Sequence, residues 1–234
     1  MSRLEIDAGQ FRANFPENSF TIRHHLADSP LFELSRLVEL SKSLPANCIE
    51  YNLGDVAVSQ DPDQTPMSQL SVEETIEKIE SCQSWLVLKY VEQDPEYEAL
   101  LDSCLAEMDV FSKPIVGAMD KKEAFIFITS PGSVTPFHFD PEHNFLLQVR
   151  GNKTMHTFDR NDRDLVPELS VERLYNPEET HRNLAFRDED QQKATTYLLH
   201  PGDGLFVPQN APHWVQNEEN ISISFSITSV SYTH

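Results

Sequence analysis

The stretch TPFHFDPEHNFLLQVRGNK, residues 135–153, places histidine and carboxylate side chains inside a run rich in Phe, Leu and Val. His138, Asp140 and His143 fall within six positions, and Lys153 follows a Gly-Asn turn. Buried charge is costly unless it is paired or bound to a metal. The stretch is therefore either a largely solvated hairpin whose histidines find hydrogen-bond partners, or part of a cation site.

The spacing of these residues favours the cation site. On an extended chain, side chains two residues apart point to the same side, so His138 and Asp140 can converge on one ion. A third ligand must come from elsewhere. The best candidate is His213, which in PGDGLFVPQNAPHWVQN (201–217) follows an apolar strand and a proline-containing bend. We therefore predict a metal site made of His138, Asp140 and His213.

The chain after about residue 123 is predicted to be mainly β structure. Short runs rich in β-branched and aromatic residues alternate there with the turn signals PGS, GN, PGDG and NEEN. This pattern favours an antiparallel barrel or sandwich. We assign residues 121–234 to this catalytic core and expect a charged insertion at about 160–192 to interrupt it. Long insertions in β folds are often lids or binding loops.

Residues 1–120 are predicted to form a helical and mixed region that packs on the barrel. The first residues of this region are expected to be polar and extended. Apolar residues at helical spacing, together with start signals such as the Ser71-x-x-Glu74 capping box, predict helices over 29–45, 71–82 and 94–108. Strands are expected within 48–60 and 84–91.

The composition of the chain indicates which kinds of binding partner and which cellular location to expect. The formal net charge of −20 repels phosphate backbones, so no nucleic-acid partner is expected, while cationic ligands or basic protein segments are favoured. No apolar run is long enough to cross a bilayer, so no membrane partner is expected. Three widely spaced cysteines and an acidic N-terminus without signal-peptide features lead us to expect a cytoplasmic location. An oligomer is compatible with the sequence.

The two ligand-bearing stretches resemble the paired signatures of the cupin double-stranded β-helix. The first contains Gly132, His138-Phe139-Asp140, Asn144 and Gly151, and the second contains Gly202, Pro208, Asn210, His213 and Asn217. An ordinary metal-binding cupin has His in place of Asp140, Glu in place of Asn144 and Gly in place of Asn210. The departures leave two histidines and one carboxylate, which is the facial triad of non-heme Fe(II) oxygenases.

The pattern is also similar to the Jumonji-C family, including its asparaginyl hydroxylase branch. That family's Thr-x-x-His-x-Asp motif, its Asn and its Lys match Thr135, His138, Asp140, Asn144 and Lys153 in register, with His213 as the distal ligand. The resemblance implies that Thr135 and Lys153 bind the C5 carboxylate of 2-oxoglutarate and that Asn144 lies near its C1 carboxylate. It also implies, on a weaker match, that Ser224 lies near this cosubstrate.

The resemblance implies an Fe(II)- and 2-oxoglutarate-dependent oxygenase on a jelly-roll of the cupin and Jumonji-C type. Such an enzyme uses O2 to hydroxylate a C–H bond of a peptide or protein side chain or of a small molecule, and demethylation is the same step on an N-methyl carbon. Two alternatives stay open. One is a non-oxidative metal-dependent cupin, such as an isomerase or decarboxylase, and the other is a catalytically silent binding or regulatory module.

Other candidate residues have simpler explanations. His143 lies beyond Pro141, where the strand is expected to turn, so we expect it beside the site or at the substrate entrance and not on the metal. If Lys153 points into the barrel, the alternation of side chains sends His156 outward. Trp85 and Trp214 are most simply aromatics of the core or of the barrel rim.

Overall fold

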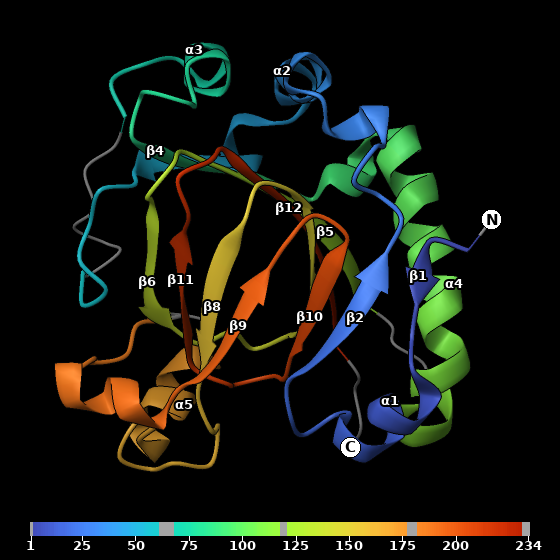
Figure 1. The fold of residues 1–234 in the computed structure, drawn as a ribbon, viewed down its shortest axis with the longest axis vertical. Coiled ribbons are helices and arrows are strands. Elements are labelled where there is room, and N and C mark those ends of the chain that lie inside the picture. Colours follow the sequence, from blue (N-terminus) through green and yellow to red (C-terminus); the bar gives the residue numbers. More distant parts are fainter. Residues whose placement is uncertain (1, 61–67, 118–120, 177–181, 231–234) are drawn as a thin grey trace.

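The computed structural model describes residues 2–60, 68–117, 121–176 and 182–230. Two antiparallel sheets face each other (Figure 1). The larger sheet has, in spatial order, β1 (Leu4–Glu5), β2 (Phe20–His24), β10 (Asp203–Val207), β7 (His143–Arg150), β12 (Ser222–Val230), β5 (Lys121–Thr129), β4 (Ser84–Lys89) and β3 (Ile49–Leu53). The smaller sheet has β6 (Val134–His138), β11 (His213–Asn217), β8 (Lys153–Thr157) and β9 (Thr195–Leu199). The predicted fold, mainly β and of the double-stranded β-helix type, is confirmed.

Alternation along β12 separates an interior face from an outer face of the larger sheet. Ile223, Phe225 and Ile227 belong to the large apolar core on the outer face. The intervening residues are buried and polar: Ser222, Ser224, Ser226 and Thr228. Because side chains of a strand point alternately to opposite sides, this polar row faces the space between the two sheets. The interior of the barrel is therefore partly polar although it is buried.

Helices cover the outer face of the larger sheet. They are α1 (Ala8–Asn14), α2 (Leu34–Ser43), α3 (Val72–Glu77) and α4 (Pro95–Val116), joined by 3-10 turns at Pro30–Phe32, Ala46–Cys48 and Val91–Gln93. Apolar residues of these helices, such as Phe11, Leu37 and Leu101, share one core with strand residues such as Leu147 and Phe225. The helices predicted at α2, α3 and α4 are confirmed, including the Ser71–Glu74 capping box. No helix among the described residues is long and apolar enough to cross a membrane.

The prediction of a merely extended N-terminus is wrong in part. Residues 8–14 form α1, and β2 pairs with β10, so the N-terminal segment extends the larger sheet. Asp7 caps α1 by accepting a hydrogen bond from the Gln10 amide, and Phe11 is its one buried residue. A seven-residue helix with a single apolar anchor shows no helical periodicity, which explains why the sequence pattern did not reveal it.

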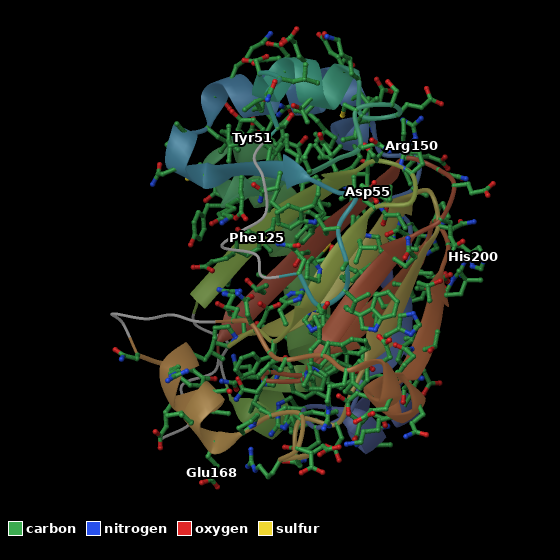
Figure 2. All side chains as sticks on the ribbon, turned by 90° about the vertical axis from the view of Figure 1, so that its left-hand side faces the viewer. Tyr51, Asp55, Phe125, Arg150, Glu168 and His200 are labelled. Carbon is green, nitrogen blue, oxygen red and sulfur yellow. The ribbon has the colours of Figure 1, made fainter. Side chains whose placement is uncertain are left out.

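The charged insertion is anchored on the smaller sheet. It contains α5 (Glu168–Leu174) and a 3-10 turn at Asp188–Lys193. Figure 2 shows α5, marked by Glu168, at the end of the barrel opposite Arg150. Its apolar residues Leu165, Val166 and Leu174 form a separate cluster with Phe137 and Phe139 of the β6 region. The insertion therefore packs directly against the segment that carries the predicted metal ligands.

Candidate metal centre

Two neighbouring strands bring the predicted histidines together. His138 is the last residue of β6 and His213 is the first residue of β11, and the two residues pair directly across the antiparallel ladder. Their ring centroids lie 4.2 Å apart. Asp140 follows β6 in the connection to β7, and its carbonyl accepts a hydrogen bond of 2.8 Å from the amide of Asn210. This bond ties the two ligand-bearing segments to each other.

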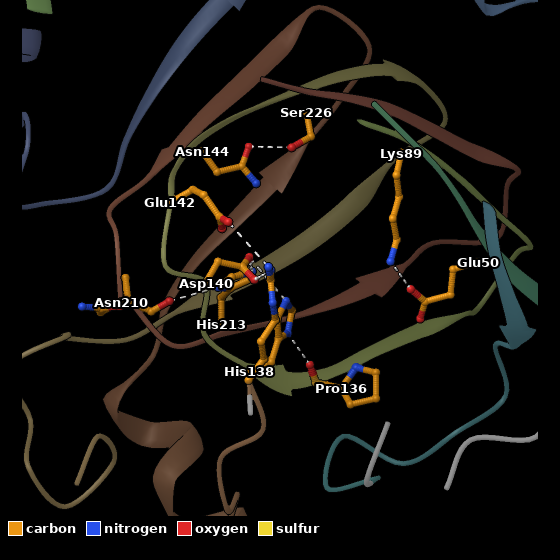
Figure 3. A network of polar contacts seen from close by, with 12 residues as sticks. Glu50, Lys89, Pro136, His138, Asp140, Glu142, Asn144, Asn210, His213 and Ser226 are labelled. Carbon is orange, nitrogen blue, oxygen red and sulfur yellow. Dashed lines mark hydrogen bonds and ion pairs between the residues drawn. The ribbon is translucent and has the colours of Figure 1, made fainter. Parts of the chain in front are cut away.

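The donor atoms of these residues converge (Figure 3). Oδ2 of Asp140 lies 3.7 Å from Nε2 of His138 and 3.6 Å from Nε2 of His213. Both histidines use Nδ1 to donate to a backbone carbonyl, at 2.7 Å to Pro136 and at 3.0 Å to Ala211. A hydrogen bond of this kind fixes the tautomer and leaves Nε2 free as a ligand.

The surroundings of Asp140 and His213 shift their pKa values in directions that favour the binding of a cation. Burial alone would raise the pKa of Asp140, but the charges of His138, His213 and Arg182 outweigh it and hold that pKa at about 2. Burial, followed by the neighbouring His138, lowers the pKa of His213 to about 4. At neutral pH the carboxylate is therefore ionised and His213 is neutral, which are the protonation states that metal coordination requires.

The residues fit a divalent metal. Two ligands that each lie about 2.0–2.2 Å from one ion must lie within about 4.4 Å of each other. The separations of 3.7 and 3.6 Å between Oδ2 of Asp140 and Nε2 of His138 and His213 satisfy this limit. Two imidazoles and one carboxylate on one side of an ion form the facial arrangement typical of non-heme iron.

Lys153 lies inside the barrel, as the alternation along its strand predicts. It pairs with Asn217 of β11 and with Leu199 of β9, and only 4% of its surface is exposed. Burial lowers the pKa of its ammonium group to about 7. No described residue forms a hydrogen bond or ion pair with this ammonium, so it is a buried cation that lacks a counter-ion. Buried lysines are rare unless they are paired.

A β-bulge orients Thr135 toward the same interior. His138 pairs with His213 and Thr135 pairs with Val215, so three steps along β6 match two steps along β11. Val215 is buried in the apolar cluster between the sheets, and directly paired residues share a face of the sheet. The bulge therefore lets Thr135 and His138 face the interior together although they are three residues apart, which regular alternation does not allow.

Asn144 and Ser224 lie at different positions along β7 and β12 and form different hydrogen bonds. Oδ1 of Asn144 accepts a hydrogen bond of 2.8 Å from Ser226. Ser224 donates at 2.7 Å to Oε1 of Gln148, and this pair is fully buried. Ser226, which the sequence reasoning did not single out, is thus the β12 hydroxyl that contacts Asn144. The roles of Asn144 and Ser224 toward a cosubstrate stay predictions.

His143 and His156 both lie outside the group of three ligands, as expected, but His143 lies on the outer face of the larger sheet and not beside the site or at a substrate entrance. His143 packs against Phe15 and Phe206 on the outer face, and its Nδ1 accepts the Gln209 amide at 3.1 Å. Burial, and then the charge of Arg160, lower the pKa of His143 to about 4. His156 stacks on Trp214 at 4.0 Å between ring centroids.

Arg182, from the insertion, is a contact of the site that the sequence did not indicate. Its Nη1 lies 2.6 Å from Oδ1 of Asp140, and its Nη2 lies 3.5 Å from Oε1 of Glu142. The carbonyl of Arg182 also accepts the Phe139 amide at 3.1 Å. Asp140 thus presents one oxygen to the histidines and the other to Arg182. Forty-two positions separate Arg182 from Asp140, so no local pattern links them.

Comparison with known proteins finds similar chains of the JmjC type. Jumonji C domain-containing protein 5 of Drosophila melanogaster is 33% identical over 122 residues, which cover 47% of this chain and 28% of that protein. Lysine-specific demethylase 8 of Danio rerio is 32% identical over 102 residues, which cover 42% of this chain and 24% of that protein. The matched region thus spans only about a quarter of the length of these relatives.

The fold is shared with solved structures of YcfD from Escherichia coli. An X-ray structure of that protein matches 98% of this chain and 54% of its own, with a TM-score of 0.65 and 16% identity. A structure titled as the ribosomal oxygenase YcfD with cobalt and 2-oxoglutarate matches 98% of this chain and 53% of its own, with a TM-score of 0.60 and 14% identity. The family profile of cupin-like domains matches residues 25–227. The chain therefore belongs to the family of cupin-like domains, and its curated relatives are proteins of the JmjC type.

Proposed function

We propose that this domain is an Fe(II)- and 2-oxoglutarate-dependent oxygenase. The observation that carries the proposal is the convergence of His138, Asp140 and His213 inside a barrel that also buries the ammonium of Lys153, which has no partner in the described part of the chain. A metal site alone does not need an internal lysine. A metal site that also binds a dicarboxylate does, because the carboxylate remote from the metal requires a cation in a water-poor interior.

Each residue has a distinct role in this proposal. His138, Asp140 and His213 hold the iron and leave its remaining positions to the cosubstrate and O2. Lys153 and Thr135 bind the C5 carboxylate of 2-oxoglutarate, while Asn144 lies near its C1 carboxylate and Ser224 contributes a further polar contact. Iron and 2-oxoglutarate together supply the oxidising power for hydroxylation of a C–H bond, and the chain supplies binding, orientation and exclusion of water.

One wall of the barrel supports the exclusion of water. Buried apolar side chains from both sheets meet there: Leu146, Met155, Leu199, Leu205, Val207, Ala211 and Val215. An apolar wall strengthens the charge-assisted hydrogen bonds of the neighbouring polar groups, because it lowers the local dielectric constant.

For the substrate we propose a peptide or protein segment of basic character. The net charge of −20 attracts such segments over long range. Close to the metal ligands, burial raises the pKa of Glu142 to about 6, and its side chain, only 15% exposed, shares Arg182 with Asp140, so a second carboxyl group lies near the site. The names of the similar proteins include a demethylase and a ribosomal oxygenase, which supports a protein substrate. We propose hydroxylation as the outcome.

Binding and turnover of 2-oxoglutarate test the proposal. Calorimetric titration of the anaerobic Mn(II) protein with 2-oxoglutarate should show saturable binding, tighter than that of succinate, which lacks the keto group for metal chelation. With Fe(II) and O2 the protein should release succinate from 2-oxoglutarate. If the protein holds its metal but does not bind 2-oxoglutarate at millimolar concentration, the oxygenase proposal fails and a non-oxidative cupin replaces it.

A further inference from the structure

The indole N–H of Trp85 is a buried hydrogen-bond donor without an acceptor. Nε1 of Trp85 has no hydrogen-bond partner among the residues that the structure describes, although the nitrogen itself is buried. Native proteins rarely leave a buried donor unpaired, and such a group calls for an explanation such as a bound ligand or water. The sequence had suggested only a core or rim aromatic at this position.

The strand register places Trp85 on the interior face of the larger sheet. Its neighbour Leu86 belongs to the core on the outer face, so alternation turns Trp85 the other way. Trp85 pairs directly with Thr129 of β5, and paired residues share a face. The indole ring also packs against Phe127, with 6.2 Å between ring centroids.

A short series of contacts connects Trp85 with Lys153. The hydroxyl of Thr129, the strand partner of Trp85, accepts a hydrogen bond from Nδ2 of Asn217 in the smaller sheet. Asn217 is in turn the direct strand partner of Lys153, and both side chains are buried. Trp85 and Lys153 therefore line the same part of the interior from opposite sheets.

Two unmatched donors in one interior predict a shared anionic acceptor. We propose that the indole N–H of Trp85 donates to the same carboxylate that Lys153 binds, which is the C5 carboxylate of 2-oxoglutarate. This assignment rests on the proposed function. A carboxylate accepts several hydrogen bonds at once, so one group can satisfy the ammonium and the indole together.

The second tryptophan provides a matched control. Nε1 of Trp214 donates to Oε1 of Gln191 at 3.0 Å, and its ring stacks on His156. Trp214 is thus already satisfied by the insertion. Trp85→Phe and Trp214→Phe remove the same indole N–H from the two sites and keep an aromatic ring at each.

Calorimetry of the anaerobic Mn(II) protein separates the two variants. Loss of a hydrogen bond to a charged group weakens binding about 10- to 100-fold, so Trp85→Phe should raise the Kd for 2-oxoglutarate by that factor. Its Mn(II) affinity should stay that of the wild type. Trp214→Phe should bind 2-oxoglutarate as the wild type does. The keto acid 2-oxopentanoate lacks the distal carboxylate, so wild type and Trp85→Phe should bind it equally.

A second measurement uses unmutated Trp85 and does not depend on the folding of Trp85→Phe. In the Zn(II) protein labelled with nitrogen-15, each tryptophan gives one indole N–H signal, and Trp214→Phe assigns the remaining signal to Trp85. Saturation with 2-oxoglutarate should shift the Trp85 signal downfield and slow its exchange with solvent, while 2-oxopentanoate should leave it nearly unchanged.

The outcomes distinguish the inference from the proposed function. If wild type binds 2-oxoglutarate, but Trp85→Phe binds it equally well and the Trp85 signal does not move, the inference is overturned and the oxygenase proposal stands. If wild type binds no 2-oxoglutarate while holding its metal, both are overturned.

Discussion

At the scale of single residues, the protonation states of the site depend on what each side chain contacts. Asp140 remains ionised because two imidazoles and Arg182 surround it, and this outweighs the effect of burial on its pKa. Lys153 has no such counter-charge among the described residues, and burial alone lowers its pKa to about 7. The same interior therefore holds one stabilised anion and one destabilised cation, and the cation is the group that gains most from an added carboxylate.

The burial of Lys153 predicts a dependence of stability on pH. Between the pKa of about 7 in the folded protein and the ordinary lysine value, 10.5, the unfolded chain binds more protons than the folded chain. The free energy of unfolding should therefore rise with pH across this window, and the cost of burying the charged ammonium should be fully present below pH 7. Lys153→Met should remove this dependence and raise the melting temperature at pH 6.

Denaturant unfolding of both proteins at pH 6, 8 and 10 checks this prediction. Calorimetry checks the effect of the same substitution on the binding of 2-oxoglutarate. Lys153→Met should weaken 2-oxoglutarate binding by at least about 10- to 100-fold, because it removes a charge-assisted hydrogen bond. Metal affinity should not change. A wild type whose stability follows the same pH curve as Lys153→Met would contradict the assignment of a charged, buried Lys153.

The ligand assignment predicts different effects for two residues only three positions apart. Asp140→Ala should lose most bound metal and all turnover, because it removes a donor atom and the shorter of the two ion pairs of Arg182. His143→Ala should keep one equivalent of metal, since His143 packs on the outer face against Phe15 and Phe206. Elemental analysis after gel filtration measures both. Equal metal loss in His143→Ala and His138→Ala would show that the ligand set is wrong.

At the scale of elements, two irregularities in the strands build the site. The bulge in β6 turns Thr135 and His138 to the same side. The bend before β11 places Asn210 in the left-handed region, with φ of 62°, and there its amide reaches the carbonyl of Asp140. Asn tolerates this conformation better than most residues, and Gly tolerates it best. This explains how Asn210 can replace the glycine of ordinary cupins.

The left-handed conformation of Asn210 predicts that substitutions there change stability to different degrees. Asn210→Gly should keep metal affinity and lose only the side-chain hydrogen bond with Tyr175. Asn210→Val should destabilise the protein by about 1–3 kcal/mol, because a β-branched residue is strained at positive φ. Thermal unfolding should show a melting temperature lower by about 2–12 °C for a chain of this size. Thr195→Val, at an exposed position of the extended strand β9, is the control and should change little.

At the scale of the whole molecule, the candidate metal site links parts that are distant in the sequence. Its ligands lie on β6, on β11 and in the connection that crosses from the smaller sheet to the larger one at β7. An unfolded chain does not hold these ligands together, so metal binding should stabilise the folded state. At a free metal concentration of about 100 Kd the gain is about 2.7 kcal/mol.

This linkage predicts a response to chelation. Removal of the metal with EDTA should lower the melting temperature by about 5–11 °C, given about 2–4 °C per kcal/mol for a chain of this size. Readdition of Mn(II) or Zn(II) should restore it. Asp140→Ala should melt at the same temperature with and without metal. Elemental analysis confirms that EDTA has removed the metal. If the melting temperature of the wild type then stays unchanged, the metal does not bind at a site that only the folded chain forms.

The sequence alone predicted the β class, the main helices and the three candidate ligands, because each of these has a local signature. Alternation along a strand, capping of a helix and the spacing of His138 and Asp140 all act within a few residues. The partnership with His213 followed from a second motif on a similar strand.

Only the tertiary structure decided which distant groups meet at the site. Arg182 reaches Asp140 from the insertion, Ser226 reaches Asn144 from the last strand, and Trp85 faces the same interior as Lys153 from the opposite sheet. The short helix α1 likewise depends on the burial of Phe11 in a core built from distant residues. Long-range packing leaves no periodic trace in the sequence, because strand register and burial are properties of the folded chain.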